Sequence, residues 1–362
     1  MRGVKDKAIC IHGELYTLPV TPLRYDPMGY DRPVAIRQPD KDIHFSFIRK
    51  VTAISLFSGC GGSDLALQTK GYEILWANDL SDVACDTYRA NLRYPRITCG
   101  DISEFDKFPP AQLLVGCYPC QGYTQGGRRD WYAPINFLYR QFDRVLRRVK
   151  PLAFVVENVN GMAFGESRRL LGNQLSRYRL AGYRVKWSVL NAKDYGVGQN
   201  RRRVFLVGIR SDLPFEYHFP APSHGPQSEQ PYLTQRDLLT RMPKWPEGEF
   251  NNEPFHWYYL SRRRRYEWEE PSPCIVGHWR HVPLHPMSPR LKRINTDVWR
   301  FEHSGPARRL SYPECAALQG FPRTFNWSFG TVREKFQMIG NAVPPPLFEA
   351  VLSGLERLWV IA

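Results

Sequence analysis

The chain has 362 residues and a formal net charge of +15 at pH 7. A chain of this length can bury one large core and a smaller one without disulfide staples, which excludes a small cystine-rich scaffold. Its eight cysteines are irregularly spaced, and no apolar signal segment opens the chain, so we expect a soluble intracellular protein without membrane spans. The excess of positive charge indicates a polyanionic partner, with nucleic acid as the leading candidate.

From Val51 onward, strand-like and helix-like segments alternate. The apolar, β-branched run at 51–57 is followed by the glycine-rich stretch SGCGG and by a helical segment that ends at Gly71. The same alternation continues as strands at 73–79, 96–102, 113–117 and 152–159 and helices at 81–91 and 136–149. Strands that alternate with helices predict an α/β fold with a doubly wound, mostly parallel sheet.

Two further strands are expected at 183–192 and 202–209, joined by the loop KDYGVGQN. Because this loop is short enough for a hairpin, we expect the sheet to be mixed at one edge. Beyond Ser211 the periodicity fades into proline, tryptophan and clustered charge, and it returns near Arg308. The chain is therefore expected to comprise an N-terminal extension (1–50), a main domain (51–212), an insert (213–302) and a return to the main domain (303–362).

The glycine-rich stretch FSGCGG, from Phe57 to Gly62, lacks both the spacing of the dinucleotide fingerprint and the Lys-Ser/Thr pair of a phosphate loop. Such a turn suits a ligand whose backbone-facing part is uncharged or zwitterionic, such as the methionine end of S-adenosylmethionine. An isolated glycine pattern also fits a plain strand-to-helix turn. Acids at the ends of the next two strands favour the cofactor, because Asp79 could bond ribose hydroxyls and Asp101 could meet the adenine amino group.

The segment GCYPCQGYT holds Cys117 and Cys120 in a CxxC spacing. This spacing fits half of a zinc site, a redox pair or a loop around one reactive thiol. A zinc site needs a second ligand pair, which the sequence does not offer at finger spacing. A redox CxxC opens a helix, whereas the following QGYTQGGRR is rich in glycine and suits a loop that closes over a substrate. One reactive thiol is the favoured interpretation.

Five motifs occur in a fixed order: GCYPCQGYT, ENV at 157–159, QNRRR at 199–203, RRLSYPECAALQGFP at 308–322 and QMIGNAVPP at 337–345. This series resembles that of the DNA (cytosine-5) methyltransferases, from about Val51 to Pro345 apart from the insert. The resemblance implies the S-adenosylmethionine-dependent methyltransferase fold. It also implies catalysis and cofactor binding by the main domain and target recognition by the insert. Cys117 and Tyr118 stand where the family commonly has Gly and Pro, which leaves the nucleophile in place.

The chemistry of the reaction agrees with this resemblance. Carbon 5 of cytosine is a poor nucleophile, so an enzyme that methylates it first adds a group to carbon 6, and a thiolate such as that of Cys120 does this well. Glu157 would contact N3 and the exocyclic amine and handle the proton there, and Asn158 would order its turn. Arg201 and Arg203 would lie near the site, with Arg201 contacting the base and helping keep the thiol ionised. Because bases in a duplex are stacked and paired, base flipping is expected.

The resemblance implies S-adenosylmethionine as the cofactor, with no metal. The residues expected to hold it are Phe57, Gly59, Gly61, Gly62, Asp79, Leu80, Asp101, Ile102, Pro119 and Asn341.

The insert carries Trp245, Trp257, Trp268, Trp279 and Trp299, which are expected to form a small core of its own. The run from Arg262 to Arg265 fits phosphate contacts and, nearly as well, a solvated face balanced by Glu267, Glu269 and Glu270. Side chains that could read base edges follow: His278, Arg280, His281, Arg290, Lys292, Arg293 and Asn295.

We therefore predict a site-specific DNA cytosine-5 methyltransferase of bacterial, archaeal or phage type. It is expected to act as a monomer on double-stranded DNA in the cytoplasm, associated with the nucleoid, with a cognate restriction endonuclease as a candidate partner. A tRNA methyltransferase of the same fold would have a smaller insert and a Cys-Phe-Thr after ENV. A catalytically silent DNA-binding subunit would lack Cys120 or Glu157. Neither feature occurs in the sequence.

Overall fold

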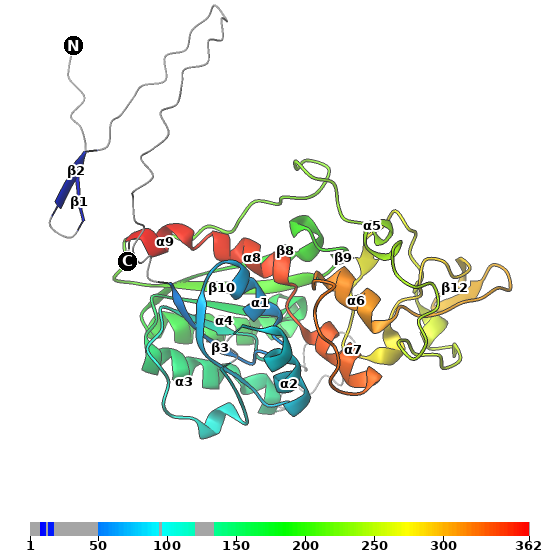
Figure 1. Cartoon of the computed structure of the whole chain (residues 1–362), viewed down its shortest axis with the longest axis horizontal. Helices are drawn as coiled ribbons and strands as arrows, with labels where there is room; N and C mark the ends of the chain where they lie inside the picture. The colour runs from blue at the N-terminus through cyan, green and yellow to red at the C-terminus, as the bar shows by residue number, and fades with distance from the viewer. Residues whose placement is uncertain (1–7, 12–13, 18–49, 94–95, 120–133, 362) are drawn as a thin grey trace, which may run out of the picture. The chain divides into compact units, whose positions relative to one another are not determined.

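The computed structural model describes residues 8–11, 14–17, 50–93, 96–119 and 134–361 (Figure 1). It divides into two units, residues 1–48 and residues 49–362. In the first unit, strands β1 (Ala8–Ile11) and β2 (Glu14–Thr17) pair antiparallel. No helix within the described ranges is long and apolar enough to cross a membrane.

The second unit is built around a sheet with the strand order β5-β4-β3-β6-β7-β10-β8. Its parallel strands are β3 (Thr52–Leu56), β4 (Glu73–Asp79), β5 (Ile97–Cys99), β6 (Leu113–Gly116) and β7 (Ala153–Val159). The chain enters at β3, moves outward through β4 to β5 and then returns to β6 on the other side of β3. The winding direction thus reverses between β3 and β6, and ligands of doubly wound sheets bind at the carboxyl ends of the strands at such a point. The predicted fold class is confirmed.

The other edge of the sheet is mixed, as predicted. Strand β10 (Arg202–Arg210) runs antiparallel to both β7 and β8 (Tyr183–Asn191). The expected hairpin of β8 and β10 therefore forms, and β10 lies between β7 and β8. Gly208 of β10 is required by packing, because a Cβ there would lie 2.0 Å from the ring of Phe154. The loop between β8 and β10 contains η6 (Ala192–Tyr195) and β9 (Gln199–Asn200).

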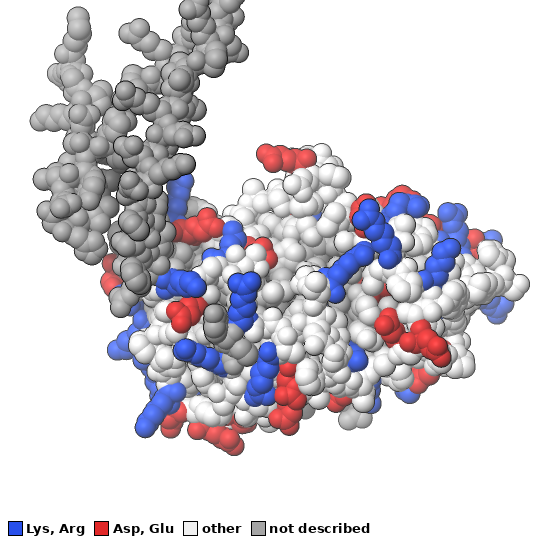
Figure 2. Space-filling view, viewed as in Figure 1, with Lys and Arg blue, Asp and Glu red and all other residues white. Residues whose placement is uncertain are grey.

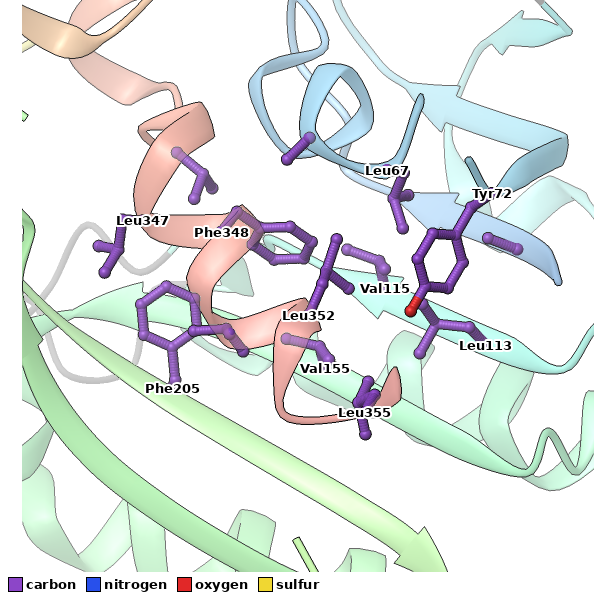
Figure 3. Packing of buried hydrophobic residues seen from close by; sticks show 14 of the residues in the cluster. Leu67, Tyr72, Leu113, Val115, Val155, Phe205, Leu347, Phe348, Leu352 and Leu355 are labelled. Atoms are coloured by element: carbon purple, nitrogen blue, oxygen red, sulfur yellow. The ribbon is translucent and has the colours of Figure 1, made fainter. Parts of the chain in front are cut away.

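Helices cover both faces of the sheet. One face carries α1 (Gly62–Thr69), α2 (Asp82–Asn91), α8 (Pro345–Ser353) and α9 (Glu356–Ile361), and the other carries α3 (Tyr139–Val149) and α4 (Arg168–Leu180). Successive side chains of a strand point to opposite faces, so Val115 belongs to the first core and Leu114 to the second. Figure 3 shows Phe348 and Leu352 of α8 packed among Val115 and Phe205 of the sheet.

The insert, residues 213–302, has little regular structure. It contains α5 (Gln235–Leu239), η7 (Tyr259–Ser261), β11 (Ser272–Pro273), η8 (Trp279–His281), β12 (Leu291–Asn295) and β13 (Val298–Phe301). After it come α6 (Tyr312–Gln319) and α7 (Val332–Asn341). A third core joins Ile275 and Val282 of the insert to Leu318, Phe336 and Ile339 of these two helices. The insert therefore shares a core with the segment that follows it.

The expectation that the tryptophans of the insert form its own core is wrong in part. Trp268 and Trp279 pack against the third core. Trp257, in contrast, is 81% exposed and Trp245 is 47% exposed. The reason is that α6 and α7 supply much of the apolar surface that the insert buries, so it does not need all of its aromatic side chains for packing.

Candidate active site

The glycine loop leaves β3 and enters α1 through several residues in left-handed backbone conformations. Gly59 and Gly61 have φ values of 54° and 96°, and Phe57 has a φ of 57°, which is uncommon for a non-glycine residue. Gly62 is required by a close approach, since a Cβ there would lie 2.4 Å from the carbonyl oxygen of Val343. The segment GNAVPP, residues 340–345, thus lies beside the glycine loop.

Asp79, at the end of β4, fixes the glycine loop from the side. Its Oδ2 accepts a hydrogen bond of 2.7 Å from the Gly59 amide, and its Oδ1 accepts one of 3.0 Å from the Ser81 amide. Burial raises the pKa of Asp79, and these backbone hydrogen bonds counteract the rise. Each carboxylate oxygen has a further lone pair, so Asp79 can still accept bonds from ribose hydroxyls. The next residue, Leu80, is 71% exposed.

The remaining expected cofactor residues in this region follow β5, which lies next to β4, and β6, which lies next to β3. Asp101 comes after β5, is exposed, and accepts a 2.8 Å hydrogen bond from the Ser103 amide that lowers its pKa. Ile102, in η1 (Ile102–Glu104), is buried, and Pro119 after β6 is half-buried. Asn341 lies at the end of α7, where its Oδ1 would be 2.6 Å from a Cβ on Gly277 of the insert.

This edge of the sheet fits S-adenosylmethionine. Within the described ranges, no atom lies within 4 Å of where a Cβ of Gly59 would be, so a ligand can approach that backbone closely. The acids Asp79 and Asp101 and the exposed Leu80 stand at neighbouring strand ends beside it. Among the residues that the structure describes, no three His, Cys, Asp or Glu side chains are grouped to hold a metal ion.

The expected nucleophile, Cys120, lies outside the described residues, and so do residues 121–133. The segment that leads to Cys120 is described as far as Pro119. Asn158 Nδ2 donates a 3.1 Å hydrogen bond to the carbonyl oxygen of Tyr118, and Asn158 Oδ1 accepts one of 2.8 Å from the Val159 amide. Asn158 thereby ties the segment before Cys120 to the end of β7. Burial raises the pKa of the other thiol of the CxxC, Cys117, well above its ordinary value, which makes it a poor nucleophile.

Glu157 lies near the carboxyl end of β7 and faces Arg203 at the start of β10. Arg203 pairs with Val159 in the sheet register, so Glu157 is its diagonal neighbour. Arg203 Nε lies 3.1 Å from Glu157 Oε1, and the two side chains are 12% and 9% exposed. Burial raises the pKa of Glu157, while the charges of Arg203 and Arg201 counteract the rise. Apart from this ion pair with Arg203, Oε1 accepts no hydrogen bond from the described residues.

Arg201 is fully buried and its terminal nitrogens are occupied. Nη1 donates to the carbonyl oxygen of Ile275, and Nη2 donates to those of Gly340 and Ala342, each at 2.9 Å. Burial lowers the pKa of Arg201 to about 10. These bonds join QNRRR to the insert and to the end of α7. The base contact expected of Arg201 does not match this placement, because its terminal donors are already bonded to protein carbonyls.

Gln199 also joins the motif QNRRR to the insert and to the segment that follows it. Its Oε1 accepts a 3.0 Å hydrogen bond from the Ile275 amide, and its Nε2 donates to the carbonyl oxygen of Leu318 at 3.3 Å. Strands β9 and β11 pair in parallel next to these contacts. The motif QNRRR therefore connects three segments that are far apart in the sequence.

Cys274 is a residue of the site that sequence reasoning missed. Its Sγ lies 3.8 Å from Arg201 Nη1. Burial acts to raise the pKa of this thiol, but the charges of Arg201 and Arg203 outweigh burial and lower it. In the sequence Cys274 is isolated, and only the pairing of β11 with β9 brings it to the arginines. No local pattern could have identified it.

Comparison with known proteins identifies the family. A model of the C-5 cytosine-specific DNA methylases matches residues 51–357. The Type II methyltransferase M.BsuRI of Bacillus subtilis is 34% identical over 352 residues, which cover 86% of this chain and 80% of the relative. The Type II methyltransferase M.FnuDI of Fusobacterium nucleatum is 33% identical over 315 residues, covering 81% of this chain and 91% of the relative.

Solved structures show the same fold at lower identity. The S. pombe Dnmt2 methyltransferase superposes with a TM-score of 0.62 at 18% identity, covering 85% of this chain and 99% of that one. The methyltransferase EhMeth of Entamoeba histolytica superposes with a TM-score of 0.63 at 15% identity, covering 86% and 99%. Since the family model spans the whole main domain, the insert and most of the return, the chain belongs to the C-5 cytosine-specific DNA methylases and is a DNA (cytosine-5) methyltransferase.

Proposed function

We propose that this enzyme methylates a cytosine that has been flipped out of double-stranded DNA at one specific sequence, through covalent addition of Cys120. The observation that carries the proposal is the Glu157–Arg203 pair. It is buried at the carboxyl end of β7, and Asn158 ties that strand end to the segment leading to Cys120. A buried acid next to a reactive thiol is the combination that attack on a cytosine ring requires.

In the proposed reaction the Cys120 thiolate forms a bond to C6 of cytosine. Glu157 gives a proton to N3 as the thiolate attacks, so the electrons displaced from the C5–C6 double bond accumulate on C5. S-adenosylmethionine, when bound, would supply an electrophilic methyl group to C5 and leave as S-adenosylhomocysteine. A proton acceptor then removes the C5 proton, which restores the C5–C6 double bond and expels the thiolate of Cys120. N3 returns its proton to Glu157. Arg203 holds the Glu157 carboxyl group in place between these steps.

We assign S-adenosylmethionine to the carboxyl ends of β3, β4, β5 and β6. The glycine loop would approach its methionine part, Asp79 its ribose, and Asp101 its adenine. Leu80 and Ile102 would contact the adenine ring, and the exposure of Leu80 supports this because a large apolar side chain is left uncovered at the strand ends.

We assign choice of the DNA sequence to the insert, residues 213–302. The candidate catalytic and cofactor residues lie outside it, and it contacts the site through Ile275 and Gly277. The relatives M.BsuRI and M.FnuDI are Type II methyltransferases. A place in a restriction-modification pair, beside a cognate endonuclease, is therefore proposed for this chain, with action as a monomer on DNA of the nucleoid in the cytoplasm.

The direct test is to express the protein in a host that lacks cytosine methylation and to sequence its DNA for modified bases. We expect 5-methylcytosine at one position of one short sequence, and none in DNA from cells that carry Cys120→Ser. A second arm offers purified tRNA and duplex DNA to the purified enzyme. Methylation confined to tRNA, or methylated cytosines without a common flanking sequence, would contradict the proposal.

A further inference from the structure

Strands β12 and β13 form a hairpin that projects from the insert (Figure 1). A two-residue turn joins them, and Asp297 in this turn has a φ of 56°. The side chains from 292 to 298 and that of Arg300 are exposed. The hairpin is therefore a ribbon that only its base attaches to the rest of the insert.

The two faces of this ribbon differ. Leu291 pairs with Phe301 and Arg293 with Trp299, and on this face Phe301 packs edge-on against Phe255 with ring centroids 5.5 Å apart. On the opposite face, Lys292 pairs directly with Arg300, and both side chains are exposed. The ribbon is thus anchored through one face and presents two cations on the other.

A directly opposed pair of like charges destabilises a ribbon of this kind. Over the part of the chain that the structure describes, the side chains of Lys292 and Arg300 form no ion pair and no hydrogen bond. The acids of the same segment, Asp297 and Glu302, pair with neither. The protein alone gives no reason to keep these two cations opposite each other, whereas a bound polyanion would neutralise both.

Several other cations of the insert are already neutralised by acids. Arg280 pairs with Glu253 at 3.0 Å, and Arg263 pairs with Glu270 at 2.6 Å. Arg265 and Arg290 both pair with Glu267. On the face shown in Figure 2, acidic side chains lie among the basic ones. Among the expected readers of base edges, Arg280 and Arg290 are thus occupied by ion pairs, whereas Lys292 of the ribbon keeps unpaired donors opposite Arg300.

Resting on the proposed function, we propose that the β12–β13 ribbon enters the major groove of DNA beside the target cytosine. Lys292 and Arg300 then donate hydrogen bonds to N7 and O6 of guanine. The major groove admits a two-stranded ribbon, whereas the minor groove is about half as wide. Guanine is the base that presents two acceptors at its major-groove edge, which matches a pair of side chains with donors only.

The experiment compares methylation by the wild type, Lys292→Ala and Arg300→Ala on the recognition site and on sites with one flanking base pair changed. We expect the preference for the correct base at one or two guanine positions to fall by about 10- to 100-fold in each variant. Replacing those guanines by 7-deazaguanine, which lacks the N7 acceptor, should weaken methylation by the wild type and have a smaller effect on the variants. Arg263→Ala removes a paired cation from the same insert and should leave the preference unchanged.

Thermal unfolding serves as the control that the variants are folded. Lys292→Ala and Arg300→Ala should unfold at or slightly above the wild-type temperature, because the repulsion between the two cations is removed. If the wild type methylates DNA and both variants keep its base preference, the proposal for the ribbon is wrong, although the proposed function stands. A uniform loss of affinity for all sequences, with a shallower salt dependence, would also overturn the proposal for the ribbon, because that result indicates phosphate contacts. A wild type that methylates no DNA would instead overturn the proposed function.

Discussion

Glu157 and Arg203 face each other across two antiparallel strands, with Oε1 and Nε 3.1 Å apart and both side chains nearly buried. Two opposing influences meet at this carboxyl group. Burial favours its neutral form and raises its pKa, whereas the guanidinium groups of Arg203 and Arg201 favour its charged form. A carboxyl group balanced in this way can give a proton to a base and take it back, which is the role we assign to Glu157.

Glu157→Gln should therefore keep the shape of the site and lose the proton transfer. We expect kcat to fall by about 10²- to 10⁴-fold, while DNA affinity and the unfolding temperature change little. The wild-type rate should also decline as the pH rises through the raised pKa of Glu157, because the protonated form is the one that acts, and this decline should be absent in the variant. Single-turnover methylation over a range of pH measures both effects.

A matched control for that change is Glu269→Gln, which removes a surface carboxylate paired with Arg236. It should methylate at the wild-type rate. If Glu157→Gln kept both the wild-type rate and its pH dependence, Glu157 could not be the group that handles the proton.

Arg201→Met should destabilise the fold, because it leaves three buried carbonyl oxygens without their donor. A loss of at least about 3 kcal/mol in the free energy of unfolding is expected, since each unsatisfied buried group costs roughly 1–3 kcal/mol. Arg202→Met, at the exposed neighbouring position, should change it little. Urea unfolding measures the difference, and equal stability of the two variants would contradict the assigned contacts.

Asp79→Ala should weaken binding of S-adenosylmethionine by about 1.5–3 kcal/mol, the range for hydrogen bonds to a charged group. Asp79→Asn keeps one acceptor oxygen and should lose less. Isothermal titration calorimetry of the cofactor gives both values, and thermal unfolding without the cofactor shows whether losing the bond to the Gly59 amide has disturbed the loop. Unchanged affinity in Asp79→Ala would remove Asp79 from the cofactor site.

Asp64 is a buried acid in the first turn of α1. Its Oδ2 accepts hydrogen bonds from the hydroxyls of Ser55 at 2.8 Å and Ser63 at 2.9 Å, and its Oδ1 accepts one from Tyr88 at 2.9 Å. Burial raises its pKa from 3.8 to about 6, although these bonds counteract the rise. The folded state therefore holds this proton more tightly than the unfolded state does.

The stability contributed by protonated Asp64 is fully present below pH 4 and is lost as the pH rises through 6. A shift of about two pKa units corresponds to a loss on the order of 3 kcal/mol. Asp64→Asn cannot titrate, so its free energy of unfolding should fall less than that of the wild type between pH 4.5 and 7.5, each measured by urea unfolding. Parallel pH dependences of the two proteins would show that Asp64 does not titrate in this range.

The main-domain strands could be predicted from the sequence because buried parallel strands are continuous apolar runs. The expected strand at 73–79 matches β4, and the expected strand at 152–159 differs from β7 by one residue. Helix α4 was not predicted, although Leu171, Leu175 and Tyr178 recur at helical spacing on its buried side. That signal was present, but arginines and Gly172 interrupt the pattern around it.

The junction around Arg201 could not be predicted in this way. Its guanidinium contacts carbonyl groups 74 and 139 residues further along the chain, and neither partner carries a side-chain signal. The motif QNRRR showed that Arg201 and Arg203 belong to the site, but only the register of β10 against β7 shows that Arg203 meets Glu157. The sequence could not predict that Trp257 is exposed either, because its exposure depends on α6 and α7 sharing the core of the insert.

In the proposed reaction the thiol of Cys120 attacks the target base. Duplex DNA with 5-fluorocytosine at the methylated position traps such an adduct, because the fluorine at C5 cannot leave as a proton does. We predict that peptide mass spectrometry of the trapped complex places the DNA on Cys120. An adduct on Cys274, whose pKa is lowered by Arg201 and Arg203, or on Cys117, or no adduct with DNA that is methylated in its unmodified form, would contradict the account.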